Sequence, residues 1–253
     1  MPARPPLVIQ ISDLHLGARW SAGDPVATTR AAVAAVKRFP GRVEAVIVSG
    51  DLTETGAAGD YELARELLAE LELPAYVIPG NHDDRAALRR AFELPGEGAD
   101  PVQYAAELGP LRLLALDSTL PGSDAGALDS GRLRWLEAEL SRAPQRPTLV
   151  ALHHPPLELG IAVWDEIGLE AESRAGLERV LAAHPQVLGT VSGHVHRPLV
   201  GQIAGRPALA IPSTYQQARL AYDLAEIELC GDPPAFAVHS LVDGRLVSHI
   251  QAF

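Results

Sequence analysis

The chain has 253 residues and 47% hydrophobic content, which allows a sizeable buried core and excludes a disordered or low-complexity protein. A formal net charge of −11 argues against nucleic acid as a partner, although a small anionic substrate stays compatible because bound cations reverse the charge locally. No apolar run approaches a membrane span, the N-terminus MPARPP lacks a signal peptide's apolar segment, and the single cysteine cannot form an internal disulfide, so we expect a cytoplasmic protein.

The N-terminal part of the chain predicts three repeats of a buried strand, a polar strand end and a helix. Each strand is a short continuous apolar run, which is typical of strands buried on both faces of a sheet. The predicted strands are 7–11, the run from Val46 to Gly50, and 75–78. The predicted helices are 24–38, 61–71 and 85–92. These repeats indicate a largely parallel sheet with right-handed crossovers.

The middle of the chain predicts a hairpin, further buried strands and two helices. We expect the hairpin over 102–106 and 111–116, strands over 148–152 and 187–191, and helices over 132–140 and 176–183. Residues 157–175 show no clean periodicity and predict a loop or short cap over the site, or a dimer contact.

The C-terminal part predicts short strands separated by glycine or proline. They are 199–203, 208–211, 224–229, 236–241 and 246–251. We expect them to form a second, mainly antiparallel sheet packed against the first. Because no repeat or linker separates the halves, we predict one domain over residues 1–253, of the α/β (α+β) class.

Polar side chains with metal-binding chemistry follow five of the predicted strands. They are Asp13 and His15, Asp51, Asn81 and His82, His153 and His154, and His194 and His196. Carboxylate, amide and imidazole ligands suit Zn, Fe, Mn, Ni or Co, and the missing thiolates argue against a structural zinc site. About seven ligands are too many for one ion, so the count predicts two ions that share a bridging carboxylate. Asp51, at the end of a central strand, is the natural bridge.

The ordered set of motifs resembles the calcineurin-like metallophosphoesterase superfamily. It comprises Asp13-x-His15, Gly50-Asp51, Gly80-Asn81-His82-Asp83, His153-His154-Pro155-Pro156 and Gly193-His194-Val195-His196. VSGDLTE, LHHPP, WDEIGL and GHVHR further resemble class III cyclic nucleotide phosphodiesterases and their glycerophosphodiesterase relatives. The resemblance implies a four-layer fold, in which two mixed β-sheets pack as a sandwich flanked by helices.

The same resemblance implies the ligands of two metal ions, which would be Fe, Mn or Zn. One ion would be held by Asp13, His15, Asp51 and His196, and the other by Asp51, Asn81, His153 and His194. The choice between His153 and His154 is open, and we take His153 because it lies nearer the strand.

The predicted mechanism is attack of a metal-bridging hydroxide on phosphorus, in line with the departing ester oxygen. Asn81 would bind metal through its carbonyl oxygen and contact phosphate through its amide. His82 would stabilise charge or protonate the leaving group, with Glu54 or Asp83 as its orienting partner. Arg197 either contacts phosphate or lies on the surface.

We expect a metal-dependent phosphoric diester hydrolase that acts on 3′,5′-cyclic nucleotides, with cyclic AMP first. The alternative substrate is a glycerophosphodiester or another small phosphodiester. An enzyme that hydrolyses a lipid-linked pyrophosphate would need a basic amphipathic cap, and a nuclease would need a basic groove. The sequence shows neither feature. A non-catalytic interaction scaffold on this fold could lose metal ligands, whereas in this sequence every expected ligand position carries a suitable residue. Relatives suggest a homodimer, for which the apolar residues of 160–169 could serve.

Overall fold

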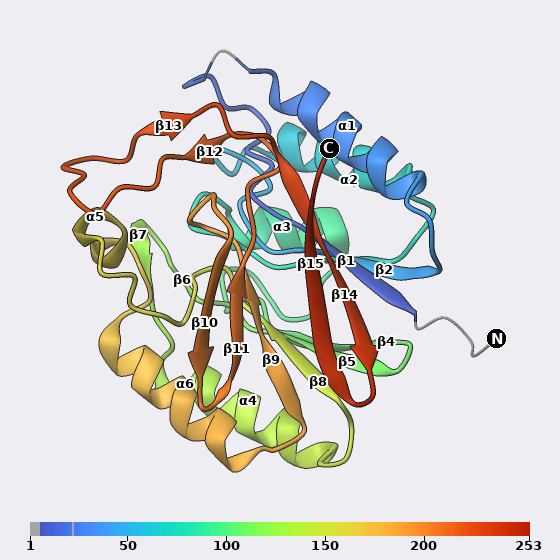
Figure 1. The fold of residues 1–253 in the computed structure, drawn as a ribbon, viewed down its shortest axis with the longest axis vertical. Helices are drawn as coiled ribbons and strands as arrows, with labels where there is room; N and C mark the ends of the chain where they lie inside the picture. The colour runs from blue at the N-terminus through green and yellow to red at the C-terminus, as the bar shows by residue number, and fades with distance from the viewer. Residues whose placement is uncertain (1–5, 22) are drawn as a thin grey trace.

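The computed structural model describes residues 6–21 and 23–253, and it shows two β-sheets packed together with helices on the outer sides (Figure 1). The first sheet has the strand order β15-β14-β1-β2-β3. Its strands are β1 (Leu7–Ile11), β2 (Val43–Val48), β3 (Ala75–Val77), β14 (Ala235–Val242) and β15 (Arg245–Ala252). β1, β2 and β3 are parallel, as the N-terminal repeats predicted, whereas β14 pairs antiparallel with β1, and β15 pairs antiparallel with β14 at the edge.

The second sheet has the order β10-β11-β9-β8-β5-β4. Its strands are β4 (Tyr104–Leu108), β5 (Leu111–Ala115), β8 (Thr148–Ala151), β9 (Val187–Ser192), β10 (Leu199–Ile203) and β11 (Arg206–Ala210). β5, β8, β9 and β11 run parallel to one another, and only the edge strands β4 and β10 are antiparallel to their neighbours.

The prediction that the C-terminal strands form a separate, mainly antiparallel sheet is therefore wrong. β10 and β11 extend the second sheet, while β14 and β15 return to the first sheet. The pairing of β14 with β1 joins residues more than two hundred positions apart, such as Leu7 and Ser240. A strand's own sequence does not specify such a distant partner, because pairing depends on which backbone edge the folded chain leaves available.

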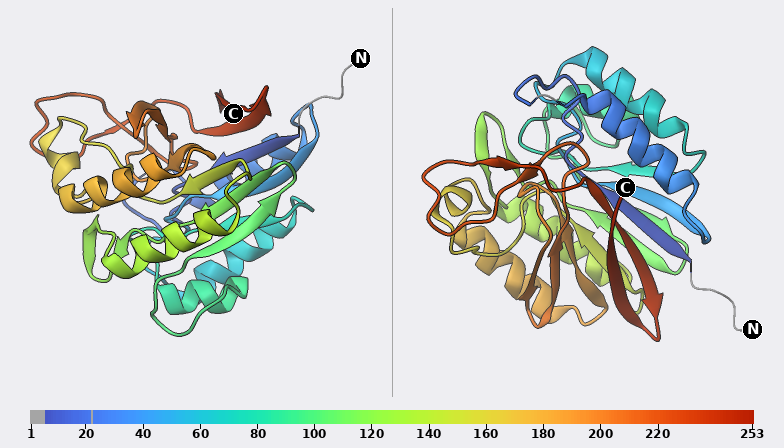
Figure 2. Two further views of the ribbon diagram at one scale, coloured as in Figure 1. Left: turned by 90° about the horizontal axis from the view of Figure 1, so that it is seen from below. Right: turned by 45° about the horizontal axis from the view of Figure 1, so that its top comes forward.

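The helices cover the outer faces of both sheets (Figure 2). α1 (Pro25–Lys37), α2 (Ala58–Ala69) and α3 (Arg85–Phe92) pack on the first sheet, and α4 (Ser130–Arg142) and α6 (Ala171–Ala183) pack on the second. Asp24, Asp84 and Asp129 begin three of these helices, since each carboxylate accepts a backbone N–H of the first turn. Apolar residues of both sheets form the core between them, which confirms the predicted four layers.

Several segments differ locally from the prediction. α6 begins at Ala171 rather than 176, and the preceding cap segment contains a short helix, α5 (Ala162–Glu166). Residues 224–229 do not form a strand; only β13 (Leu229–Cys230) pairs, with β12 (Gln217–Ala218). The glycine-rich loop after Asp117 contains an unpredicted hairpin, β6 (Thr119–Leu120) and β7 (Ser123–Gly126). These pieces are too short to show a reliable period.

Three apolar side chains of the cap segment are buried, whereas Val163 and Ile167 are half-buried. Ile161 and Trp164 are each 5% exposed and Leu169 is fully buried, so they are not free to serve the dimer contact that the sequence suggested. Among the described residues, the helices are too short or too polar to cross a lipid bilayer. The single-domain assignment of residues 1–253 stays a prediction.

Candidate metal centre

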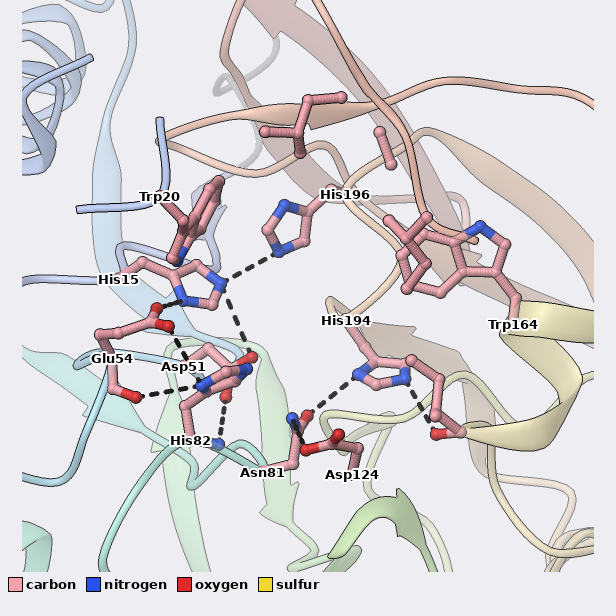
Figure 3. A pocket seen from close by; sticks show the side chains of 14 residues that line it. His15, Trp20, Asp51, Glu54, Asn81, His82, Asp124, Trp164, His194 and His196 are labelled. Atoms are coloured by element: carbon pink, nitrogen blue, oxygen red, sulfur yellow. Dashed lines mark hydrogen bonds and ion pairs between the residues drawn. The ribbon is translucent and has the colours of Figure 1, made fainter. Parts of the chain in front are cut away.

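The ends of β1, β2 and β3 in the first sheet meet the ends of β8 and β9 in the second sheet at one edge of the molecule. This edge gathers all seven side chains that the sequence predicted as metal ligands, several of which are drawn in Figure 3. Six of them are buried, and Asn81 is half-buried. Residues from 13 to 196 thus share one site because parallel strands place their carboxyl ends at the same edge.

One donor set consists of Asp13, His15, His196 and Asp51. The Nε2 atoms of His15 and His196 lie 3.0 Å apart, and His196 Nε2 is 3.5 Å from Asp13 Oδ1. His15 Nε2 also lies 3.7 Å from Asp51 Oδ2. Donor atoms around one ion at bond lengths of about 2.0–2.2 Å are expected to lie roughly 3 Å or slightly more apart.

The other donor set consists of Asp51, Asn81, His153 and His194. His153 Nε2 is 3.2 Å from the same Asp51 Oδ2, and Asn81 Oδ1 is 3.1 Å from both His153 Nε2 and His194 Nδ1. Asp51 Oδ2 therefore belongs to both sets. The spacing and chemistry of these oxygen and imidazole donors fit two neighbouring ions of the kind that accept mixed nitrogen and oxygen ligands.

Each of the four histidines is oriented by a hydrogen bond from its other ring nitrogen. His153 Nδ1 donates to Ser49 O at 2.8 Å, His194 Nε2 to Ile167 O at 3.0 Å, and His196 Nδ1 to Gln216 O at 2.7 Å. His15 Nδ1 contacts the Glu54 carboxylate at 2.8 Å. Carbonyl and carboxylate oxygens accept hydrogen bonds, so in the neutral ring the nitrogen facing the centre is the one that carries the lone pair for a metal ion.

His154 lies beside His153 but faces away from the centre. Its Nδ1 atom is 2.8 Å from Ser118 Oγ, and its Nε2 atom is 3.0 Å from Asp124 O. Both ring nitrogens are therefore engaged by the loop that contains β6 and β7. This arrangement favours His153 as the ligand, which was the choice made from the sequence.

The backbone is strained at five of the predicted ligands. Positive φ angles occur at Asp13 (54°), His15 (47°), Asp51 (49°), His194 (72°) and His196 (49°). This left-handed conformation costs an L-residue roughly 1–2 kcal/mol, and such strain is concentrated at functional sites. Gly50 has a φ of 104° and packs against the His153 ring, while a Cβ at Gly80 would overlap Asp51. The glycines beside the ligands therefore allow the strand ends to approach closely.

The charges of the centre are strongly coupled. Burial acts to raise the pKa of Asp51, but His153 and His15 hold that pKa well below its usual range. Burial acts to lower the pKa of His153, yet the Asp51 and Asp13 carboxylates raise it to about 9. The pKa of His194 is well below its ordinary value because of burial and the neighbouring His154 and His153 rings. Metal binding at His153 would thus displace a proton, whereas Asp51 and His194 are already in their ligating forms at neutral pH.

His82 lies on the cavity side of the centre (Figure 3). Its backbone N–H donates to Asp51 Oδ1 at 3.0 Å, and its Nδ1 atom donates to Glu54 O at 3.0 Å. Burial acts to lower the pKa of His82, but the charge of Asp51 and the Glu54 contacts raise it overall. Of its two predicted partners only Glu54 is in contact. Asp83 points the other way and accepts backbone N–H groups of Leu52 and Gly80.

Arg197 does not face the cavity. Its guanidinium group donates to Ala218 O and pairs with Asp232 at 3.3 Å, close to β12 and β13. The position directly after a ligand suggested a phosphate contact, but these two contacts hold the guanidinium group outside the cavity over the donors. The geometry therefore supports the surface alternative for Arg197.

A cavity of about 310 Å³ lies over the two donor sets. One side is apolar and is formed by Trp164, Ile167, Ala218, Ile227 and Leu229. Asp124 also reaches the cavity and accepts a hydrogen bond from Asn81 Nδ2 at 3.4 Å. Sequence reasoning placed Trp164 and Ile167 near the pocket, within the WDEIGL motif, but missed Ala218, Ile227 and Leu229. Among the described residues, no Lys or Arg side chain lines the cavity.

Comparison with known proteins identifies the family of the chain. Residues 6–198 match the family described as calcineurin-like phosphoesterase. The chain belongs to this family. Family membership confirms the predicted resemblance and the prediction of a phosphoesterase, and it implies a dinuclear metal centre.

Members of the family with curated names are similar to most of the chain. A probable glycerophosphodiester phosphodiesterase GpdQ of Arcobacter nitrofigilis is 32% identical, with 92% of this chain and 88% of the relative covered. The 3′,5′-cyclic adenosine monophosphate phosphodiesterase CpdA of Pseudomonas aeruginosa is 33% identical, with 83% of this chain and 77% of the relative covered. A dimetal phosphatase from Danio rerio shares the fold with a TM-score of 0.74 and 18% identity, over 98% of this chain and 97% of that one.

Proposed function

We propose that this chain is a dinuclear metal-dependent phosphodiesterase that hydrolyses 3′,5′-cyclic nucleotides, with cyclic AMP as the first candidate substrate. The family and its curated relatives make the chain a phosphodiesterase hydrolase. The observation that carries the proposal is the pair of donor sets sharing Asp51 beneath a cavity sized for a small molecule. A complete donor set argues against a scaffold that has lost catalysis.

We assign the donors to two ions of Fe, Mn or Zn. Asp13, His15 and His196 would hold one ion, Asn81, His153 and His194 the other, and Asp51 would bridge them. Two such ions supply a nucleophile from water at neutral pH and neutralise charge on the phosphate oxygens.

The protein's own residues orient the substrate and move protons. Asn81 directs its carbonyl oxygen toward the donors and its amide toward the cavity floor at Asp124, where a bound phosphate oxygen would compete for the amide N–H. Asp51 and Glu54 raise the pKa of His82, which favours the protonated ring, and Glu54 O holds that ring in place to act as proton donor to the leaving oxygen.

The cavity wall favours a substrate with one negative charge and one flat apolar group. A wall without Lys or Arg, among the described residues, suits a singly charged phosphodiester better than a phosphate monoester or a polyphosphate. The apolar side formed by Trp164, Ile227 and Leu229 offers a surface for a nucleobase. The name of the relative CpdA agrees with this substrate class.

A glycerophosphodiester is the second candidate substrate. The Asp124 and Glu54 carboxylates line the same cavity and would accept hydrogen bonds from glycerol hydroxyls. Trp20, which is 40% exposed, could contact the cation of an ethanolamine or choline head group. The relative GpdQ has a name of this kind. A cytoplasmic location and a homodimer stay predictions.

The deciding experiment compares hydrolysis of 3′,5′-cyclic AMP, glycerophosphoethanolamine and bis-p-nitrophenyl phosphate. Each substrate is tested with manganese-loaded and chelator-stripped protein, and with Asn81→Ala as the control. We expect metal-dependent turnover of cyclic AMP that Asn81→Ala abolishes. Efficient turnover of glycerophosphoethanolamine with cyclic AMP left intact would assign the second substrate. Failure of all three substrates with metal-loaded protein would overturn the proposed function.

A further inference from the structure

Gln10 forms a buried polar contact between the two sheets, directly behind the metal centre. It lies on β1 and has no exposed surface. Its Nε2 atom donates to Ser49 Oγ at 2.7 Å and to Ser192 O at 3.0 Å. Ser49 follows β2 of the first sheet, whereas Ser192 ends β9 of the second sheet. One amide group thus connects the two sheets beside the apolar residues that pack between them.

His239 on β14 holds Gln10 in this orientation. His239 Nε2 is 3.0 Å from Gln10 Oε1, and His239 Nδ1 is 2.8 Å from Ser248 Oγ on β15. Because Ser192 O can only accept, the Gln10 amide nitrogen must face it, and His239 must donate from Nε2. Burial lowers the pKa of His239 to about 4, so the ring is neutral at pH 7 and presents the single Nε2 proton that this arrangement needs.

The two serines that Gln10 contacts precede proposed metal ligands. Ser49 is followed by Gly50 and Asp51, and its carbonyl oxygen accepts the Nδ1–H of His153 at 2.8 Å. Ser192 is followed by Gly193 and His194. Any change in the separation of Ser49 and Ser192 therefore changes the distance from Asp51, the shared donor, to His194.

We propose that Gln10, held by His239, is a positioning residue that sets the separation of the two sheets at the metal centre. The proposal rests on the dinuclear centre assigned above. An apolar side chain could fill this space, but it would give the strand ends no directional contact. The hydrogen bonds connect the strand end that carries the shared carboxylate to the strand end that carries His194 and His196. Removing a hydrogen-bond partner of a metal ligand commonly changes metal affinity about 10- to 100-fold, and Gln10 holds such a partner, because Ser49 O accepts from His153.

The test is calorimetric titration of Mn²⁺ into chelator-stripped full-length protein. Gln10→Leu removes the contacts at similar volume, and we expect it to weaken binding of at least one Mn²⁺ about tenfold or more. His239→Leu should weaken binding in the same direction. His239→Gln should restore most of the affinity, because a Gln amide can donate to Gln10 Oε1 from nearly the position of the imidazole Nε2. Leu181→Ala on α6 is a control for stability loss, since Leu181 is buried against α4 and the second sheet, outside the cavity lining.

The outcomes separate this proposal from the proposed function. Wild-type protein that binds two Mn²⁺ ions while Gln10→Leu binds both with unchanged affinity would overturn the positioning role and leave the metal centre intact. An equal loss of Mn²⁺ affinity in Gln10→Leu and Leu181→Ala would also overturn it, because general destabilisation would then explain the loss. Wild-type protein that binds no Mn²⁺, and none when the titration is repeated with Zn²⁺ and Fe²⁺, would refute the proposed function, and the positioning role would fail with it. A tenfold loss in Gln10→Leu, with rescue by His239→Gln over His239→Leu, supports the proposal.

Discussion

The donor side chains and the wall of the cavity above them are held in different ways. Asp51 is 2% exposed at the end of a buried strand, and each donor histidine has a second hydrogen bond that orients its ring. The wall comes from short, separate segments, and part of it is much more exposed, with Trp20 at 40%, Ile227 at 41% and Leu229 at 43%. Changes to the donors should therefore abolish catalysis, whereas changes to the wall should alter the preference among substrates.

Asp51→Ala should have the largest effect, because Asp51 is the one donor common to both sets. We expect loss of both metal ions and a fall in turnover of roughly 1,000-fold or more. Metal content after gel filtration and turnover of bis-p-nitrophenyl phosphate measure the two effects. Asp232→Ala, on an exposed carboxylate outside this cavity, is the control. Two bound ions in Asp51→Ala would show that the bridge is assigned wrongly.

His82→Ala should lower turnover of cyclic AMP about 100-fold while leaving metal content unchanged. An alkoxide leaving group needs a proton, and a p-nitrophenolate does not. The loss should therefore be much smaller for bis-p-nitrophenyl phosphate. Equal losses with both substrates would exclude leaving-group protonation and leave charge stabilisation as the role of His82.

Acidic pH should lower the stability of the folded protein because it protonates His239, which holds Gln10 behind the metal centre. Its folded pKa is about 4 and its ordinary value is 6.5, so the unfolded chain binds the proton more tightly. The stability contributed by neutral His239 is complete above pH 6.5 and is lost as the pH falls toward 4. At pH 5 the stability lost in this way is about 2 kcal/mol, which is roughly 30-fold in the unfolding equilibrium.

Urea unfolding of chelator-stripped protein at pH 7.5 and pH 5 measures this effect. The His239→Gln variant has no group at this position that is protonated in this range. Between the two pH values it should therefore lose about 2 kcal/mol less stability than the wild-type protein. An identical pH dependence in both proteins would mean that His239 titrates normally in the folded state.

Leu229→Ser should change the substrate preference without disturbing the donors. Leu229 is 43% exposed at the cavity wall and outside the donor sets, so folding and metal content should be preserved. We expect an increase in KM for cyclic AMP of about fivefold, since a small apolar contact is lost, with kcat nearly unchanged. Glycerophosphoethanolamine, which lacks a nucleobase, is the comparison substrate. An equal increase in its KM would contradict a base-binding wall.

Arg197→Leu should have the smallest effect. The guanidinium group pairs with Asp232, which is 60% exposed, and surface pairs of this kind contribute about 0–1 kcal/mol. We expect kcat and KM for cyclic AMP within about twofold of wild type. A tenfold loss of kcat in a normally folded variant would reinstate the phosphate contact considered from the sequence.

Much of the fold and most of the donor set could be predicted because both depend on local patterns. Continuous apolar runs predicted buried strands, and the polar residues that follow them lie at strand ends in the structure. Parallel strands place those ends together, so Asp13, Asp51 and His153 could be grouped without coordinates. The resemblance added the division into two metal sites, and the shared contacts of Asp51 fit that division.

The tertiary structure decided everything that depends on partners distant in the sequence. It returned β14 and β15 to the first sheet, turned His154 and Arg197 away from the centre, and joined Gln10 to Ser192 and His239. It also built the cavity wall from short, separate segments whose residues follow no period. A local sequence pattern determines which face of a strand is buried and which residue ends it. The neighbour that a side chain meets is determined only when the whole chain has packed, because that contact depends on the placement of every intervening element.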